Sequence, residues 1–467
     1  MSTACKSPQD DYSPNVVFIL VDDLGWKDLG SYGSEFYDTP NLDSLAKEGI
    51  RFTNAYSAHP VCSPTRAAIM TGKDPVRVGI TDWIPGMGTE RAPDPQLVPP
   101  EDIHHLPLEE KTIAEAFKEE GYKTFFAGKW HLGETKEYWP EHQGFDINKG
   151  GHNKGSPPAG YYAPYQNPRL EDGPEGEYLT DRLADESIHF IEDMASKDQP
   201  FFLFLSFYTV HTPIQGAKQF DALYKEKKEQ LPDEGAPESR KEGLGQTRVT
   251  QSNYKYAAMV RSMDENVGRI LDRLESLNLS DNTIIVFTSD NGGLTTTKEM
   301  GPTAVTPLRA GKGWAYEGGI RVPLIIRAPN MPQGKVSHQP ITSMDYYPTL
   351  LELADLPLDS HQHVDGRSLA TYLKNPEQVD ERTLVWHYPH YHGSMWRPGT
   401  AIRRGNWKLI EFYEEDKVEL YNLKDDIEER YDISEDYPDK AAELREEMHS
   451  YIHQRDGQYP RRINYPE

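Results

Sequence analysis

The segment Val61–Lys73 places a potential nucleophile beside a side chain that binds anions. Pro64 suits the first turn of a helix, because its missing N–H needs no partner there, and Gly72 is a natural helix end. Cys62 would then lie at the N-terminus of a helix, where free N–H groups favour negative charge. The guanidinium of Arg66, one turn further on, is suited to binding an oxyanion. Taken alone, the pattern also fits an ordinary helix that begins near a buried cysteine.

Polar side chains follow four apolar runs that we predict to be buried strands, at 16–21, 123–127, 201–207 and 283–288. The residues that follow these runs are Asp22 and Asp23, Lys129 and His131, His211, and Asp290 and Asn291. Because ligands of open α/β sheets bind beyond the carboxyl ends of the strands, we expect these residues and the cysteine helix to form one site. Taken alone, the pair Asp22-Asp23 fits helix capping or a turn equally well.

The expected site divides by charge. Four residues offer only oxygen ligands, which suits a hard cation such as Ca²⁺ or Mg²⁺ rather than zinc; they are Asp22, Asp23, Asp290 and Asn291. Three residues supply positive charge, namely Arg66, Lys129 and Lys312. Two histidines, His131 and His211, can transfer protons near neutral pH. Such a set can hold a tetrahedral oxyanion and stabilise the charge that develops as its ester bond breaks.

The elements that must position these residues alternate between strand and helix. Further helices are predicted at 42–47, from the capping box at 112–115 to residue 121, through 183–194, at 256–274 and from 347. Further strands are predicted at 50–55 and 322–326, with a long ordered loop at 150–177 and a surface excursion at 225–248. The alternation predicts an α/β fold with a mostly parallel central sheet flanked by helices.

The pattern changes beyond residue 375. Short antiparallel strands are predicted at 400–402, 407–412 and 419–423, followed by a helix at 438–453. We therefore predict three parts: an N-terminal tether at 1–13, a catalytic α/β domain at 14–375, and a small C-terminal subdomain of antiparallel sheet plus helix at 376–467.

Composition excludes some classes of protein. The chain has 75 acidic residues against 50 Lys and Arg, a formal net charge of −25, which argues against nucleic acid as a partner. No apolar run approaches the roughly 20 residues of a transmembrane segment. Cys5, followed by a polar tether, looks like the mature end of a bacterial lipoprotein, so a periplasmic or cell-surface location is expected; an ordinary N-terminus is the alternative.

The segment Cys62-Ser63-Pro64-Thr65-Arg66 resembles the C-x-P-x-R signature of the type I sulfatases, which belong to the alkaline phosphatase superfamily. Thr65 is a small departure, because Ser or Ala is more frequent there. The likeness continues, in the order of the family, through 15–25, 128–133, 211–213, 289–293, 311–323 and 345–351, and through 407–409 and 419–423 at the C-terminus. It covers nearly the whole chain and implies the alkaline phosphatase-like sulfatase fold.

The resemblance also implies an activity, the hydrolysis of sulfate monoesters. In this family the cysteine is oxidised after translation to formylglycine (3-oxoalanine), so the implied partner is a formylglycine-generating or anaerobic sulfatase-maturating enzyme. Carried over by position, the likeness implies that one Ca²⁺ ion, more than Mg²⁺, binds beside residue 62; its ligands would be Asp22, Asp23, Asp290 and Asn291.

The resemblance further implies a role for each remaining residue. A hydroxyl of the hydrated aldehyde, activated by Ca²⁺ and Arg66, would attack sulfur. Lys129 would hold the sulfate, and His211 with Lys312 would protonate the departing oxygen. His131 would then take the proton from the second hydroxyl, so that the adduct collapses to aldehyde and free sulfate.

Substrate contacts are less determined by the sequence. Aromatic rings stack on sugar faces, and His, Asp or Asn can bond hydroxyls, although each such residue could instead only pack a loop. The candidates are Asp82, Trp83, His104, His152 with Asn153, Trp314, and the run 386–392 with His387 and His390, together with Arg397. Bacterial relatives of this size usually act on sulfated glycans, so the expected substrate is a sulfated polysaccharide or oligosaccharide, with a galactose-type unit as one option.

Three other functions stay open at this point. A phosphodiesterase or phosphonate monoester hydrolase of the same superfamily can share every core residue. A cysteine hydrolase would use Cys62 with His131 or His211, but it leaves the oxygen ligands and cations without a task. A sulfoglycan-binding module with an inactive site would arise if residue 62 stayed unconverted.

Overall fold

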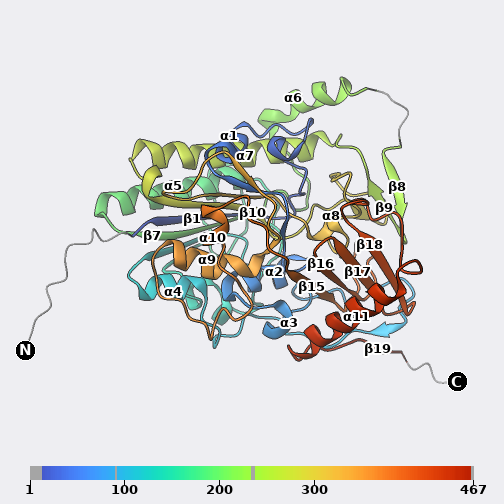
Figure 1. Ribbon diagram of the computed structural model, residues 1–467. Coiled ribbons are helices and arrows are strands. Elements are labelled where there is room, and N and C mark those ends of the chain that lie inside the picture. Colours follow the sequence, from blue (N-terminus) through green and yellow to red (C-terminus); the bar gives the residue numbers. More distant parts are fainter. Residues whose placement is uncertain (1–12, 90–91, 233–236, 464–467) are drawn as a thin grey trace, which may run out of the picture.

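The structure is a computed structural model that describes residues 13–89, 92–232 and 237–463. A large sheet runs through the middle of the molecule with helices on both faces, and a smaller sheet with one helix lies at one end (Figure 1). The tether expected at 1–13 lies outside the described residues apart from Ser13, and so does Cys5. In the described ranges, no helix has both the length and the apolar composition that crossing a membrane requires.

The central sheet has eight strands in the order β13-β2-β12-β10-β1-β7-β5-β6. Their bounds are β1 Asn15–Val21, β2 Ile50–Phe52, β5 Lys123–Gly128, β6 Ile147–Lys149, β7 Phe201–Phe207, β10 Thr283–Ser289, β12 Leu324–Arg327 and β13 Lys335–Ser337. Strand β12 runs antiparallel to its neighbours β10 and β2, while the other pairs are parallel. The prediction of a mostly parallel sheet is therefore confirmed.

Strand β1 is completely buried, which explains its uninterrupted apolar sequence. Alternate side chains point to opposite faces of the sheet. Val17 packs in one apolar cluster with helices α5 Leu179–Lys197 and α7 Tyr254–Ser276. Its neighbour Phe18 packs in another cluster with α2 Cys62–Thr71, α4 Ile113–Glu119 and α9 Tyr346–Leu353. The sheet is thus the middle of three layers.

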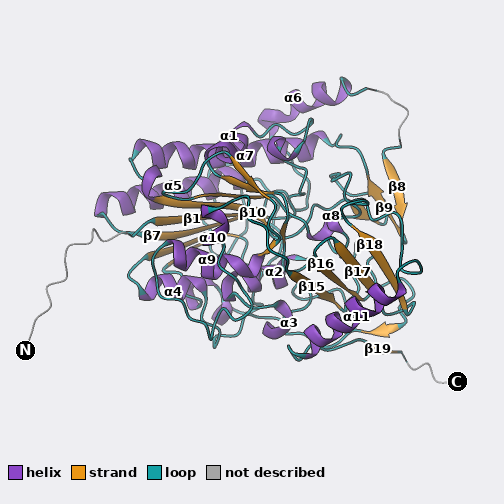
Figure 2. Ribbon diagram, in the orientation of Figure 1, coloured by secondary structure: helices purple, strands orange, loops and turns teal. Residues whose placement is uncertain are grey.

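The two helical layers are visible in Figure 2. Helices α1 Pro40–Glu48, α5 and α7 cover one face, with α6 Lys218–Glu229 packed against α7. Helices α2, α4, α9 and α10 Ala370–Lys374 cover the other face. The capping box predicted from the sequence begins α4, where the Thr112 side chain and the Glu115 backbone N–H are 3.1 Å apart.

The C-terminal sheet contains four antiparallel strands, β15 Thr383–Tyr388, β16 Gly399–Arg404, β17 Trp407–Phe412 and β18 Lys417–Asn422. Helix α11, Pro438–His453, packs against it through Ala441, Leu444, Met448 and Ile452. Three of these strands and the helix are predicted. Strand β15 differs from the expectation, since residues up to 388 of the run 386–392 form a buried strand rather than a loop around a pocket.

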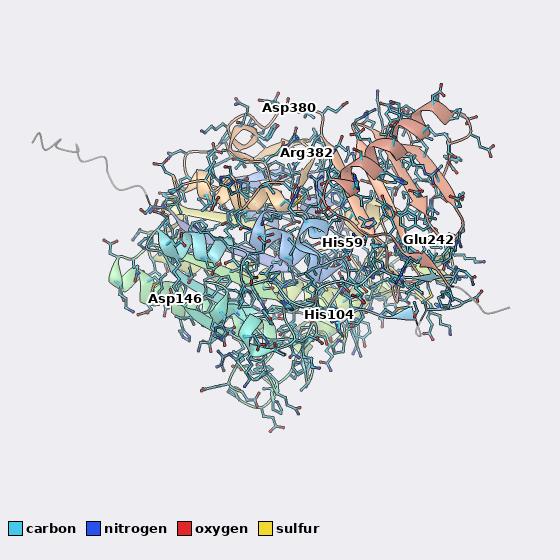
Figure 3. The ribbon with its side chains drawn as sticks, turned by 90° about the horizontal axis from the view of Figure 1, so that it is seen from below. His59, His104, Asp146, Glu242, Asp380 and Arg382 are labelled. Carbon is cyan, nitrogen blue, oxygen red and sulfur yellow. The ribbon has the colours of Figure 1, made fainter. Side chains whose placement is uncertain are left out.

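Shorter elements connect these parts. They are β3 Ala55–Tyr56 paired with β14 Ile341–Thr342, β4 Leu97–Val98 with β19 Arg461–Arg462, the hairpin β8 Ser239–Glu242 and β9 Gly245–Arg248 paired with β11 Thr296–Thr297, and helices α3 Pro75–Val78 and α8 Glu317–Ile320. The 3₁₀ helices are Gly30–Tyr32, Lys136–Tyr138, Pro140–His142, Ser280–Asn282 and Ser343–Asp345. The expected surface excursion therefore contains a hairpin, and Glu242 at its turn lies beside the C-terminal sheet (Figure 3).

Candidate active site

The carboxyl ends of neighbouring parallel strands bring the predicted residues together. Strand β1 lies between β10 and β7, and β7 lies beside β5. The backbone N–H of Asp22 donates to the carbonyl of Thr209 at 3.0 Å, and that of Asp23 donates to Oδ1 of Asp290 at 3.2 Å. The ends of β1, β7 and β10 are thus joined directly by hydrogen bonds.

Each carboxylate of this group has a cation of its own. Nζ of Lys129 donates to Oδ2 of Asp22 at 2.7 Å, and both side chains are fully buried. Nε of Arg66 donates to Oδ2 of Asp290 at 2.9 Å. Nζ of Lys312 lies 2.6 Å from Oδ1 of Asp23. The cluster therefore alternates negative and positive charge, and all six side chains are buried.

Two oxygen atoms of the cluster have no partner in the part of the chain that the structure describes. They are Oδ1 of Asp22 and Oδ1 of Asn291, and both are buried. An unpaired buried oxygen costs free energy, so a hydrogen-bond donor or a cation bound to each of these atoms would stabilise the protein. One ligand atom each from Asp22, Asp23 and His211 lies within 4.8 Å of the others. These residues could hold one cation.

The pKa values of the carboxyl groups depend on burial and on the neighbouring charges. Burial, with the neighbouring Asp290 and Asp23, raises the pKa of Asp22 well above its usual value despite Lys129. Burial acts the same way on Asp290, but Arg66 and Lys129 outweigh it and lower the pKa. The carboxyl group of Asp22 is thus the one whose burial Lys129 does not offset, and a bound cation would offset it.

Cys62 is the first residue of α2, as the sequence predicts, and the helix ends at Gly72 in a left-handed conformation with φ 66°. Sγ of Cys62 lies 3.3 Å from Nδ1 of His131. Nε2 of His131 lies 2.6 Å from the carbonyl oxygen of Ile84, which can only accept, so Nε2 carries the ring proton. Nδ1 is therefore a free acceptor that faces the side chain at position 62.

A cavity of about 530 Å³ opens above these groups. Its lining residues are Asp23, Cys62, Trp83, Ile84, Pro85, His131, Glu134, Asn153, Lys154, Gly155, Ser156, His211, Leu294, Thr297, Lys312, His392, Gly393 and Ser394. Arg66 and Lys129 do not line it; they lie behind the wall, bound to Asp290 and Asp22. Cys62, both proposed proton carriers and one of the three predicted cations, Lys312, thus share one space.

The candidate substrate residues separate into two groups. Trp83 lines the cavity, and Oδ1 of Asp82 accepts its backbone N–H at 2.8 Å, so Asp82 positions this residue. His104, labelled in Figure 3, lies 3.5 Å from the carboxylate of Glu134 at the cavity rim. His152 is buried directly beside the lining residue Asn153.

The other four candidates lie outside the cavity lining, as Asp82, His104 and His152 do, and their polar groups bond with other parts of the protein. His387 in β15 bonds with Thr400 and the carbonyl of Gln458, and His390 bonds with Thr81. Arg397 pairs with Glu414, and Trp314 donates to the carbonyl of Ser394.

Sequence reasoning missed several lining residues, including Glu134, Lys154 and Ser394 on loops and Thr297 in β11. Glu134 follows His131 by three residues, and Thr297 follows Asn291 by six. Closeness to a predicted site residue was the available signal for these two. Nothing local in the sequence indicates that Ser394 reaches the same cavity.

Two family models match the chain. One described as Sulfatase matches residues 14–356, and one described as N-sulphoglucosamine sulphohydrolase, C-terminal, matches residues 310–458. The chain is 32% identical to a sulfatase of Formosa agariphila, over 94% of this chain and 88% of the relative. It is 33% identical to the N-acetylgalactosamine-6-sulfatase of Homo sapiens, over 79% of this chain and 67% of the relative.

Solved structures share the fold. The chain is 31% identical to Ps i-CgsB in complex with k-i-k-neocarrahexaose, with a TM-score of 0.75 over 94% of this chain and 93% of that one. A phosphonate monoester hydrolase of Agrobacterium radiobacter is 19% identical, with a TM-score of 0.68 over 97% of this chain and 98% of that one, which shows the fold alone.

Proposed function

This chain belongs to the sulfatase family and is a sulfuric ester hydrolase, and on that premise we propose that it removes sulfate from a sulfated carbohydrate by means of one Ca²⁺ ion and a formylglycine made from Cys62. A maturating enzyme, either formylglycine-generating or of the anaerobic type, would carry out the conversion.

One observation carries the proposal for a metal ion. Oδ1 of Asp22 and Oδ1 of Asn291 are buried without a partner among the described residues, beside carboxylates whose other oxygens are already bound. A set made of carboxylate and amide oxygens fits a hard cation such as Ca²⁺. Asp22, Asp23, Asp290 and Asn291 would hold it. When bound, the ion supplies positive charge to the group at position 62 and to the sulfate oxygens.

The side chain of residue 62 is placed where a nucleophile is useful. It begins α2, so the free N–H groups of the first turn favour negative charge on it. Conversion to a hydrated aldehyde would give this position two hydroxyl groups. Nδ1 of His131, at 3.3 Å from Sγ of Cys62, can accept a proton from that side chain. Burial and the charge of Lys129 lower the pKa of His131, which keeps it a neutral acceptor.

The remaining cations have separate tasks. Nζ of Lys312 and Nε2 of His211 lie 2.6 Å and 3.8 Å from Asp23, on the cavity wall. Lys312 can stabilise the charge on the ester oxygen that leaves sulfur. Nδ1 of His211 lies 2.8 Å from the carbonyl oxygen of Thr212 and carries the proton of the neutral ring, so His211 protonates the leaving oxygen from Nε2 once the ring holds a second proton. Arg66 and Lys129 lie behind the cavity wall, where each holds one carboxylate of the proposed metal site in place.

Cavity shape and relatives support a sugar as the group that carries the sulfate. The cavity is large enough for a sugar unit, and the ring of Trp83 on its wall is suited to stacking on a sugar face. A relative 33% identical to this chain is named for N-acetylgalactosamine 6-sulfate, and a 31% identical structure contains a neocarrahexaose. We propose a galactose-type unit as the first class to test.

The test begins with the intact mass of the peptide that contains residue 62, which reports conversion of the thiol. Converted protein is then assayed on 4-nitrophenyl sulfate, on a panel of sulfated galactose, N-acetylgalactosamine and glucosamine derivatives, and on bis(4-nitrophenyl) phosphate. We expect sulfate release from at least one sulfated galactose-type sugar, and rates on the phosphate diester far below those on the aryl sulfate. A converted enzyme that prefers the phosphate diester would overturn the proposed reaction.

A further inference from the structure

One wall of the active-site cavity comes from the C-terminal part of the chain. The connection between β15 and β16 makes a tight turn, in which the N–H of Met395 donates to the carbonyl of His392 at 3.0 Å. The indole N–H of Trp314 donates to the carbonyl of Ser394 at 2.8 Å. Because Trp314 follows Lys312 by two residues, this bond fixes the turn against the loop that carries Lys312.

The backbone of the turn determines where the imidazole of His392 carries its proton. The N–H of Ser394 donates to Nδ1 of His392 at 3.1 Å, and the hydroxyl of Ser394 lies 2.7 Å from the same atom. A backbone N–H can only donate, so Nδ1 is unprotonated and the ring proton is on Nε2. Nε2 has no hydrogen-bond partner among the residues that the structure describes, and His392 lines the cavity.

The ring is held rigidly beside the reacting end of the cavity. A Cβ atom at Gly313, which has φ +81°, would lie 2.1 Å from Nδ1 of His392, so only glycine allows this approach. Burial and the charge of Lys312 lower the pKa of His392 to about 3, which agrees with a neutral ring. A neutral donor on a fixed ring suits the recognition of an uncharged oxygen acceptor.

We propose that His392 is a specificity-determining residue, whose Nε2–H donates a hydrogen bond to a hydroxyl or ring oxygen of the sugar that carries the sulfate. The inference rests on the proposed function, because it assigns a contact to the same substrate. It gives the C-terminal part of the chain a direct role in choosing the sugar, while the groups around residue 62 act on the sulfate.

Two substitutions separate the donor from the support of the turn. In His392→Asn, Oδ1 can accept the N–H of Ser394 in place of Nδ1, but no atom reaches the position of Nε2. In His392→Gln, the amide nitrogen lies near that position and keeps a donor. His449→Asn, in α11 and away from the cavity lining, is the matched control. Each variant is assayed on the best sulfated sugar of the panel and on 4-nitrophenyl sulfate, with melting temperatures measured in parallel.

We expect His392→Asn to lower kcat/KM on the sugar by roughly 10-fold, the effect of one lost hydrogen bond, and to leave kcat/KM on the aryl sulfate within about twofold. His392→Gln should recover part of the loss, and His449→Asn should lose nothing. Equal effects on both substrates, or none on either, would overturn the assignment of His392 alone. Wild-type protein that hydrolyses the aryl sulfate but no sugar of the panel would overturn the substrate class and the His392 contact with it.

Discussion

The amide nitrogen of Asn291 donates to Oδ1 of Asp23 at 2.8 Å and to the carbonyl of Gly292 at 3.0 Å. These two bonds fix the orientation of the amide, and its oxygen is left buried without a partner among the described residues. Nζ of Lys312 also lies 2.6 Å from the same oxygen of Asp23. The residues of the acidic cluster therefore orient one another before any ligand arrives.

Removal of metal should lower both stability and activity. A ligand that binds only the folded state stabilises it, by about 2.7 kcal/mol at 100 times its Kd. We expect a chelator to lower the melting temperature and the rate on 4-nitrophenyl sulfate, and added Ca²⁺ to restore both. Asn291→Ala should lose the calcium-dependent change in melting temperature, whereas Asn282→Ala, which precedes the other end of β10, should keep it. An unchanged calcium response in Asn291→Ala would remove Asn291 from the ligand set.

Replacing Cys62 with Ser should abolish turnover and leave the fold intact. A serine hydroxyl can attack sulfur, but the resulting ester has no second hydroxyl whose proton could be removed to release it. We expect kcat to fall by at least about 1000-fold with a melting temperature within a few degrees of wild type. Steady multiple turnover by this variant, measured as sulfate released per enzyme over time, is the result that contradicts the formylglycine mechanism.

The effect of His211→Ala should depend on the leaving group. A sugar alkoxide needs a proton as it departs, whereas 4-nitrophenolate is stable without one. We expect a loss of about 100-fold or more in kcat on a sulfated sugar and a smaller loss on 4-nitrophenyl sulfate. Comparison of kcat for the two substrates is the measurement, and equal losses would remove His211 from the acid role.

Buried histidines should make the fold sensitive to acid. Burial lowers the pKa of His387 from 6.5 to about 4. Below pH 6.5 the unfolded chain takes up a proton at this residue that the folded chain does not. The stability that depends on a neutral ring is therefore present above pH 6.5 and is lost as the pH falls toward 4, by up to about 1.4 kcal/mol per pH unit.

Urea denaturation at pH 8, 6 and 5 measures this dependence. His387→Gln cannot take up a proton, so its free energy of unfolding should fall less between pH 8 and 5 than that of the wild type. His453→Gln replaces an exposed histidine at the end of α11 and should keep the wild-type slope. Parallel slopes for all three proteins would show that His387 is not protonated on unfolding in this range.

A buried lysine should be important for joining the C-terminal sheet to the body of the molecule. Nζ of Lys408 lies 3.0 Å from Oε1 of Glu317 and 2.7 Å from Oε1 of Glu429, and all three side chains are fully buried. Lys408→Met would leave the buried carboxylate of Glu429 without its cation and Glu317 paired with Arg321 alone, so we expect a loss of about 3–5 kcal/mol in the free energy of unfolding. The double variant Lys408→Met with Glu429→Gln should recover part of that loss. A double variant less stable than Lys408→Met would contradict this account.

The residues at the strand ends could be predicted because each follows an apolar run that is typical of a buried strand. Asp22 and Asp290 come directly after β1 and β10, and parallel strands end at the same edge of a sheet. The Cys62 helix was equally readable, since Pro64 and Gly72 mark its two ends. Local sequence patterns were sufficient for these parts.

The cavity walls could not be predicted in the same way. His387 and His392 lie five residues apart in one aromatic and histidine-rich run, yet the first is bonded inside β15 and the second faces the cavity. What distinguishes them is contact with residues far away in the chain, such as Gln458 and Gly313. The hairpin of β8 and β9 was missed for a similar reason, because its pairing with β11 gives order to a charged segment.

The turn at His392–Ser394 lies far downstream of the residues that surround Cys62, and Gly313 and Trp314, beside Lys312, contact it. Substitution of a few residues in this turn can therefore alter which sugars the enzyme accepts, while the residues that would bind the cation stay unchanged. Related enzymes could come to differ in the sugars that they accept through changes in this turn. The same few positions can be varied in a small library of variants to engineer the substrate range.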